Sequence, residues 1–175
     1  DRLARGKAGS GNWQADWIYV TDIGQPGHSG HWEPTRSGLP REWTVSVGDQ
    51  TVCCRLDAHG RVGLQGRDIC CAAWVRRRIE GCYDLDDINV LNLFGGNGYV
   101  TAAALHAGAS VVHVDASEDM LALARANAGD RQVEYLQDDV MNYVEACLRR
   151  QQRFDMVILP VPPLGHGPRG QMWDR

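Results

Sequence analysis

The sequence predicts an α/β fold built on a parallel β-sheet, with a smaller β-rich module before it. Short runs rich in apolar residues recur after residue 84, at INVLNLF, SVVHVDA, VEYLQDD and FDMVILPV. Helical segments of about ten residues separate these runs. Alternation of apolar strands with helices is typical of βαβ units, whose parallel strands are buried on both faces.

The helices between these strands are expected over residues 99–107, 118–128 and 140–152. Ser117 precedes the second helix and is a favourable N-cap. One face of the third helix is expected to cover the sheet. Six residues fall on this face, and all but Gln151 are apolar: Val140, Tyr143, Val144, Cys147, Leu148 and Gln151.

We divide the chain into three parts. Residues 1–12 are predicted to be a flexible basic tail, 13–83 a β-rich module, and 84–175 the α/β domain. In the module we expect strands over 17–20, 42–47 and 51–56, with a tight turn beginning at Gly48 between the last two. The segment 24–40 is predicted to be a loop, and 68–80 a helix with Asp68 as its N-cap and Gly81 just beyond its end.

Composition limits the function. The 175 residues carry a net charge of −4, which excludes a protein that coats nucleic acid through a bulk basic surface. Any RNA contact must therefore be local, and Arg76, Arg77 and Arg78 form the strongest local basic patch. This patch is interpreted either as a solvated helix end favoured by the helix dipole or as a phosphate contact.

The sequence contains neither a membrane-spanning apolar run nor a secretory signal. We therefore expect a soluble intracellular protein of the cytoplasm or mitochondrial matrix. The six cysteines lack zinc-site spacing and are expected to be reduced, with Cys147 structural. Among the histidines, His106 is expected late in a helix and His113 pointing out of the core of its strand.

A glycine-rich turn follows the first strand of the α/β domain, in the sequence Phe94-Gly95-Gly96-Asn97-Gly98. Glycine permits positive φ and lets a ligand approach the backbone, and the helix that follows offers free N–H groups. Asp115 ends the second strand, at the neighbouring strand end if the crossover is right-handed. A carboxylate there suits a ribose diol, although such a turn is also compatible with a purely structural role.

The run G-G-N-G differs from the dinucleotide pattern G-x-G-x-x-G, which disfavours an oxidoreductase. Together with Asp138-Asp139 after the third strand, it resembles the class I S-adenosylmethionine methyltransferases. LNLFGGNG, HVDAS, QDDVMNYV and PPLGHGPRGQMW further resemble the ribosomal RNA large-subunit methyltransferases typified by the cytosine-C5 enzymes. The resemblance implies S-adenosylmethionine as cofactor and a Rossmann-like sheet that is incomplete at its C-terminal end.

The resemblance also implies roles for five residues. Phe94, Gly96 and Gly98 line the first turn, Asp115 meets the ribose, and Asp139 meets the adenine. The sequence departs from the family in two places. Pro160 stands where the family has an aspartate. The family's cysteine nucleophile, which lies after the fourth strand, has no counterpart in residues 1–175. No catalytic residue is therefore identified.

Two functions follow from this resemblance. The first is a methyltransferase that acts on ribosomal RNA. The second is an inactive, methyltransferase-derived structural or assembly subunit of a ribonucleoprotein such as the mitochondrial ribosome, with a protein partner over the open edge of the sheet.

Overall fold

The computed structural model describes residues 15–21, 30–57, 60–82, 87–160, 164–166 and 172–174. The predicted basic tail over 1–12 lies outside these residues. None of the helices in the described part is long and apolar enough to cross a membrane.

A parallel four-stranded sheet, in the order β7-β6-β5-β8, forms the centre of the α/β part. Its strands are β5 (Asn89–Leu93), β6 (Ser110–Asp115), β7 (Val133–Gln137) and β8 (Met156–Ile158). The prediction of a parallel sheet is confirmed. The last strand is shorter than its apolar run, because it pairs with β5 over only three residues.

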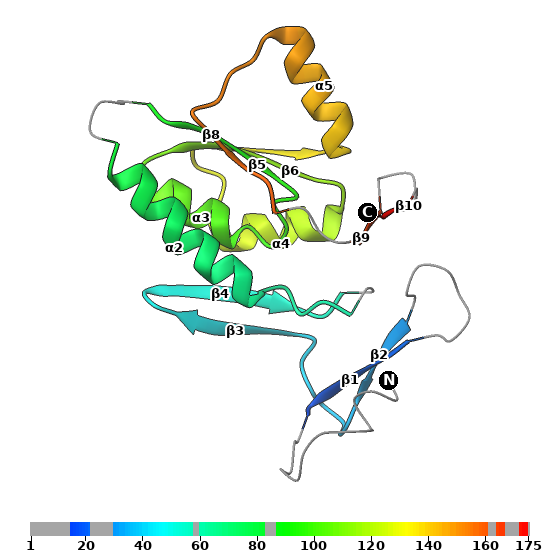
Figure 1. Ribbon diagram of the computed structural model, residues 1–175. Coiled ribbons are helices and arrows are strands. Elements are labelled where there is room, and N and C mark those ends of the chain that lie inside the picture. Colours follow the sequence, from blue (N-terminus) through cyan, green and yellow to red (C-terminus); the bar gives the residue numbers. More distant parts are fainter. Residues whose placement is uncertain are drawn as a thin grey trace.

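Helices cover both faces of this sheet (Figure 1). On one face lie α2 (Gly66–Glu80), α3 (Tyr99–His106) and α4 (Glu118–Ala128), and on the other lies α5 (Val140–Arg150). Ser117 caps α4 by accepting a hydrogen bond from the Met120 amide, as expected. The predicted apolar face of α5 is confirmed at Val140, Tyr143 and Cys147, which are buried. It is wrong at Leu148, whose side chain is 73% exposed.

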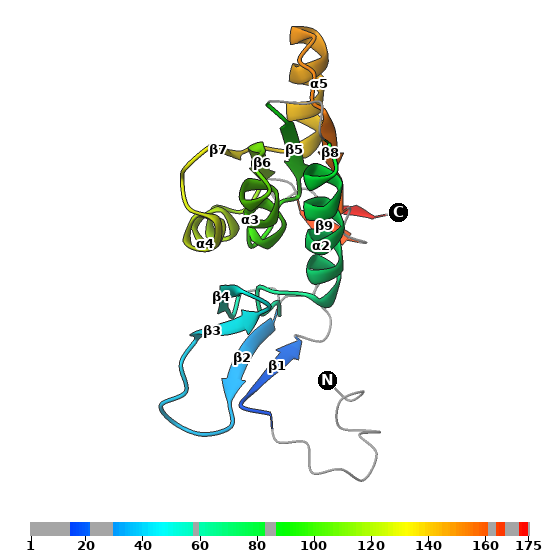
Figure 2. The same ribbon diagram turned by 90° about the vertical axis from the view of Figure 1, so that its left-hand side faces the viewer.

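The N-terminal strands form two antiparallel hairpins beyond the helix layer, which Figures 1 and 2 show from two sides. One pairs β1 (Trp17–Thr21) with β2 (Gly30–Pro34), and the other pairs β3 (Glu42–Val47) with β4 (Gln50–Arg55). The prediction of a loop over 24–40 is therefore wrong at β2. Two short strands near the C-terminus, β9 (Leu164–His166) and β10 (Met172–Asp174), pair antiparallel.

The start of α2 also differs from the prediction. The helix begins at Gly66, and its N-cap is Gln65 rather than Asp68. Asp68 instead occupies the third helical position, where its carboxylate accepts a hydrogen bond from the Gln65 amide at 2.9 Å. This is a capping box, in which the acidic residue satisfies the amide before the helix rather than starting the helix itself.

A buried polar chain joins the sheet to α3. The Asn92 amide donates to the Thr101 hydroxyl at 2.9 Å, and that hydroxyl lies 2.8 Å from Nδ1 of His113. His113 is fully buried, so the expectation that it points out of the core is wrong. The sequence pattern missed this because a histidine in an apolar strand is buried only when a polar partner, here Thr101, lies on the covering helix.

His113 makes stability depend on pH. Burial, with a smaller contribution from the charge of Arg125, lowers its pKa from 6.5 to about 4. The unfolded chain takes up this proton as the pH falls below 6.5, whereas the folded chain does not. The stability that His113 confers is therefore complete above pH 6.5 and is lost as the pH falls towards 4.

We predict that the free energy of unfolding decreases by about 3 kcal/mol more between pH 6.5 and 4 in the wild type than in His113→Gln. Urea unfolding followed by circular dichroism at a series of pH values measures both slopes. Identical slopes in the two proteins would contradict the buried, neutral state of His113.

Candidate cofactor site

The turn between β5 and α3 has an unusual backbone. Phe94, Gly96 and Gly98 have φ angles of 50°, 58° and 77°, in the left-handed region that favours glycine. Phe94 takes this conformation at a cost of about 1 kcal/mol, and its half-buried ring contacts the cluster between the sheet and α5. The backbone of residues 94–98 is thus bent back sharply at the carboxyl end of β5.

The three glycines of this turn have three different reasons to lack a side chain. A Cβ atom at Gly95 would lie 2.4 Å from the His113 ring, and one at Gly98 would lie 2.6 Å from the Cα of Ala124 in α4. At Gly96 a Cβ would meet nothing closer than the Phe94 carbonyl, at 3.9 Å. Gly95 and Gly98 therefore allow close packing, whereas Gly96 leaves open space in front of the backbone.

Asp115 lies at this turn, as the right-handed crossover predicts. One carboxylate oxygen accepts a hydrogen bond from the Gly96 amide at 2.9 Å, and the other accepts one from the Ser117 amide at 2.9 Å. A carboxylate has about four acceptor positions, so about two remain for a ligand. Burial raises the pKa of Asp115, although the bonds from Ser117 and Gly96 and the charge of Arg61 act in the opposite direction.

Asp139 lies at the next strand end. Because β7 pairs with β6, the Asp138 amide comes within 3.3 Å of the Asp115 carbonyl. Asp139 is the N-cap of α5, and its Oδ1 accepts from the amides of Met141 and Asn142 at 2.9 and 3.2 Å. This capping role, which the sequence analysis did not consider, leaves the second oxygen for another donor.

The N-terminal module reaches the glycine turn through two asparagines that the sequence analysis did not single out. Asn97 donates to the Gly63 carbonyl at 2.9 Å and accepts from the Tyr99 amide at 3.0 Å. Asn127 of α4 donates to the carbonyls of Asn97 and Cys53, and its Oδ1 accepts from the Cys53 amide at 2.7 Å. An asparagine between glycines just before a helix was the available signal for the first of them.

The three arginines of the basic run have separate environments on α2. Arg76 forms ion pairs with Glu80 at 2.8 Å and with Asp49 at 3.7 Å. Arg77 and Arg78 are exposed, and the Arg78 guanidinium lies 5.4 Å from the centre of the Trp74 ring. The run is therefore not a single patch of free cations.

Pro160 lies two residues after the end of β8 and is half-buried. A proline side chain neither accepts a hydrogen bond nor transfers a proton, so this strand end lacks the polar group that the resembled family has there.

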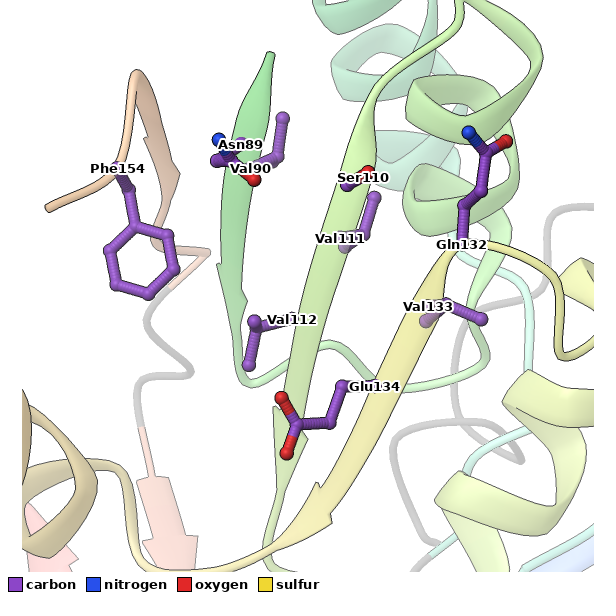
Figure 3. A pocket seen from close by; sticks show the side chains of 9 residues that line it. All are labelled: Asn89, Val90, Ser110, Val111, Val112, Gln132, Val133, Glu134 and Phe154. Carbon is purple, nitrogen blue, oxygen red and sulfur yellow. The ribbon is translucent and has the colours of Figure 1, made fainter. Parts of the chain in front are cut away.

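A cavity of about 280 Å³ lies elsewhere, at the opposite end of the strands (Figure 3). Its lining includes Asn89 and Ser110, the first residues of β5 and β6, and Gln132, which directly precedes β7. Residues 95–98 and Asp115 lie at the carboxyl ends, where ligands of open α/β sheets bind. This cavity is therefore separate from the candidate cofactor site.

The residues at the glycine turn fit a nucleoside cofactor. Open backbone at Gly96 permits close approach, and the remaining acceptor positions of Asp115 suit the two hydroxyl groups of a ribose. The second oxygen of Asp139 lies at the neighbouring strand end, where an exocyclic amine is a suitable donor.

Comparison with known proteins agrees with this geometry. Residues 90–173 match the family described as Methyltransferase domain. Ribosomal RNA large subunit methyltransferase I of Alteromonas mediterranea is 37% identical over 91 residues, covering 49% of this chain and 23% of the relative. The enzyme of the same name from Salmonella arizonae is 34% identical over 84 residues, covering 45% and 21%.

A solved structure extends the likeness to nearly the whole chain. The SAM-dependent methyltransferase from Agrobacterium tumefaciens superposes with a TM-score of 0.76 at 28% identity, covering 99% of this chain and 52% of its own. The present chain thus spans about a fifth of the length of the curated relatives and half of that structure. Residues 90–173 thus match a methyltransferase domain, and the chain shares its fold with a SAM-dependent methyltransferase and sequence similarity with the ribosomal RNA large-subunit methyltransferases.

Proposed function

We propose that the chain provides the methyl-donor domain of a methyltransferase that acts on ribosomal RNA. The observation that carries this proposal is the position of the Asp115 carboxylate, held at the glycine turn by the Gly96 amide. The names of the relatives support ribosomal RNA as the substrate. S-adenosylmethionine supplies an electrophilic methyl group when it is bound.

In this proposal the residues of the chain bind and orient the donor. The backbone of Phe94, Gly96 and Gly98 surrounds its amino acid part, Asp115 accepts hydrogen bonds from the ribose hydroxyls, and Asp139 accepts one from the adenine amine. Asn97 and Asn127 hold the turn against the N-terminal module and so fix its shape.

Pro160 favours a second candidate, an inactive methyltransferase-derived subunit of a ribonucleoprotein assembly. The carboxyl end of β8 borders β5, the strand that leads into the glycine turn, and it carries no side chain able to accept a proton there. Donor binding is expected in both candidates, whereas methyl transfer is expected only in the first. The mitochondrial ribosome is one setting for the second.

We predict that S-adenosylhomocysteine binds to the wild type and binds about 10- to 100-fold more weakly to Asp115→Asn, because charge-assisted hydrogen bonds to the ribose are lost. Isothermal titration calorimetry measures both affinities. Asp119→Asn is the matched control, since Asp119 is an exposed carboxylate at the start of α4.

The same titration has a pH signature. As the pH falls through the raised pKa of Asp115, the wild type loses affinity because the carboxyl becomes protonated, whereas Asp115→Asn keeps a flat profile. Equal affinities of wild type and Asp115→Asn at neutral pH would contradict the assignment of the ribose site.

Methyl transfer separates the two candidate functions. We expect the wild type to transfer a tritiated methyl group from S-adenosylmethionine to ribosomal RNA freed of protein, and Asp115→Asn to transfer far less. Incorporation is counted after RNA precipitation, with heat-denatured protein as the control. Donor binding without incorporation would overturn the enzyme and support the assembly subunit.

A further inference from the structure

One side of α2 carries an uncovered row of basic and aromatic residues. With 3.6 residues per turn, the positions 67, 70, 74, 77 and 78 fall on one side of the helix. We call this the α2 stripe, and its members are exposed: Arg67, Cys70, Trp74, Arg77 and Arg78. The opposite side of α2, with Ala72, Val75 and Ile79, is buried in the core cluster that includes α3.

Trp74 is the centre of the α2 stripe. Its side chain is 49% exposed, although tryptophan is among the residues with most to gain from burial. The guanidinium of Arg78 lies over its ring, 5.4 Å from the centroid. A cation on an exposed tryptophan forms a flat, positively charged platform on which another planar group can stack.

The charge of the stripe contrasts with that of the protein. The chain has a net charge of −4, yet the stripe contains three arginines and no carboxylate. The two acids of α2 lie off this side of the helix: Asp68 bonds the Gln65 amide in the capping box and lies 3.7 Å from Arg67, and Glu80 pairs with Arg76. The stripe is therefore complementary to a polyanion that also offers flat groups.

We propose that the α2 stripe binds single-stranded RNA, with an unpaired base stacked on Trp74 and phosphates contacted by Arg67, Arg77 and Arg78. This proposal rests on the proposed function, since it assigns a docking surface to its substrate. Paired RNA hides its base faces, so an aromatic platform favours an unpaired strand. Arg76, with its two acidic partners, is not part of this surface.

The stripe also leads towards the cofactor site. Its first residue, Arg67, stands at the start of α2, just after the loop whose Gly63 carbonyl accepts a hydrogen bond from Asn97 in the glycine turn. An RNA strand bound along α2 would therefore have one end near the carboxyl edge of the sheet. Figure 2 shows α2 side-on, with α3 and α4 beside it under the sheet.

Fluorescence anisotropy with a labelled single-stranded RNA 12-mer of mixed sequence tests the platform. We expect Trp74→Ala to weaken binding about tenfold, the loss of one stacked base, and Trp74→Phe to retain most of the affinity. The double variant Arg77→Gln/Arg78→Gln should reduce the slope of log affinity against log salt by about 1.4. The matched control Arg76→Gln should bind like the wild type.

A second measurement uses the wild type alone and so does not depend on how well a variant folds. Ultraviolet cross-linking of the wild type to the same RNA, followed by trypsin, should place an adduct on the peptide 68–76, which contains Trp74. Unchanged RNA affinity in Trp74→Ala and in the arginine double variant, or cross-links only elsewhere, would overturn the proposal. So would equal, Trp74-dependent binding of poly-glutamate, which would indicate an acidic protein partner.

Failure of this surface and failure of the proposed function are distinguishable. Asp115→Asn should bind S-adenosylhomocysteine more weakly and RNA as tightly as the wild type does, whereas Trp74→Ala should do the reverse. If the wild type binds RNA but not S-adenosylhomocysteine, the proposed donor site is contradicted and the proposed role of the α2 stripe is supported. If the wild type binds S-adenosylhomocysteine but not RNA, only the proposed role of the α2 stripe is contradicted.

Discussion

The hydrogen bond between the Gly96 amide and the Asp115 carboxylate is the contact on which the rest of this site depends. It joins the first turn of the sheet to the end of the second strand, and the Ser117 amide holds the other oxygen of the same carboxylate. The carboxylate is thereby fixed beside open backbone rather than facing bulk water. Removal of the Asp115 charge would weaken its hydrogen bond with the Gly96 amide and the acceptor position that suits a ribose hydroxyl.

The N-terminal module contributes to the same turn. Asn97 holds the loop at Gly63, and Asn127 joins the β3–β4 hairpin to the Asn97 carbonyl. Because these amides satisfy partly buried backbone groups, the module and the sheet share one polar network. Arg61, in the same loop, adds a positive charge that favours the ionised form of Asp115. The loop before α2 is thus part of the electrostatic environment of the cofactor site.

Much of the fold could be predicted from the sequence, because apolar strands and helical spacing are local signals. The parallel sheet, the Ser117 cap and the meeting of Asp115 with the glycine turn followed from them. Three features did not, since each depends on a partner far along the chain. The strand β2 is recognisable only through its pairing with β1, and His113 is buried because Thr101 faces it. Arg76 pairs with Glu80 on its own helix and also with Asp49 of the neighbouring hairpin, a partner that helical spacing does not reveal. Exposed Leu148 shows the reverse case, an apolar residue at helical spacing that nothing in the described residues covers.

A crystal structure of the chain with S-adenosylhomocysteine tests the central claim most directly. The account predicts both ribose hydroxyls within about 3 Å of the Asp115 carboxylate oxygens, with the adenine beside Asp139 and the Gly96 backbone against the ligand. Density for the nucleoside in the cavity at the amino ends of the strands, or a ribose that does not contact Asp115, would contradict it.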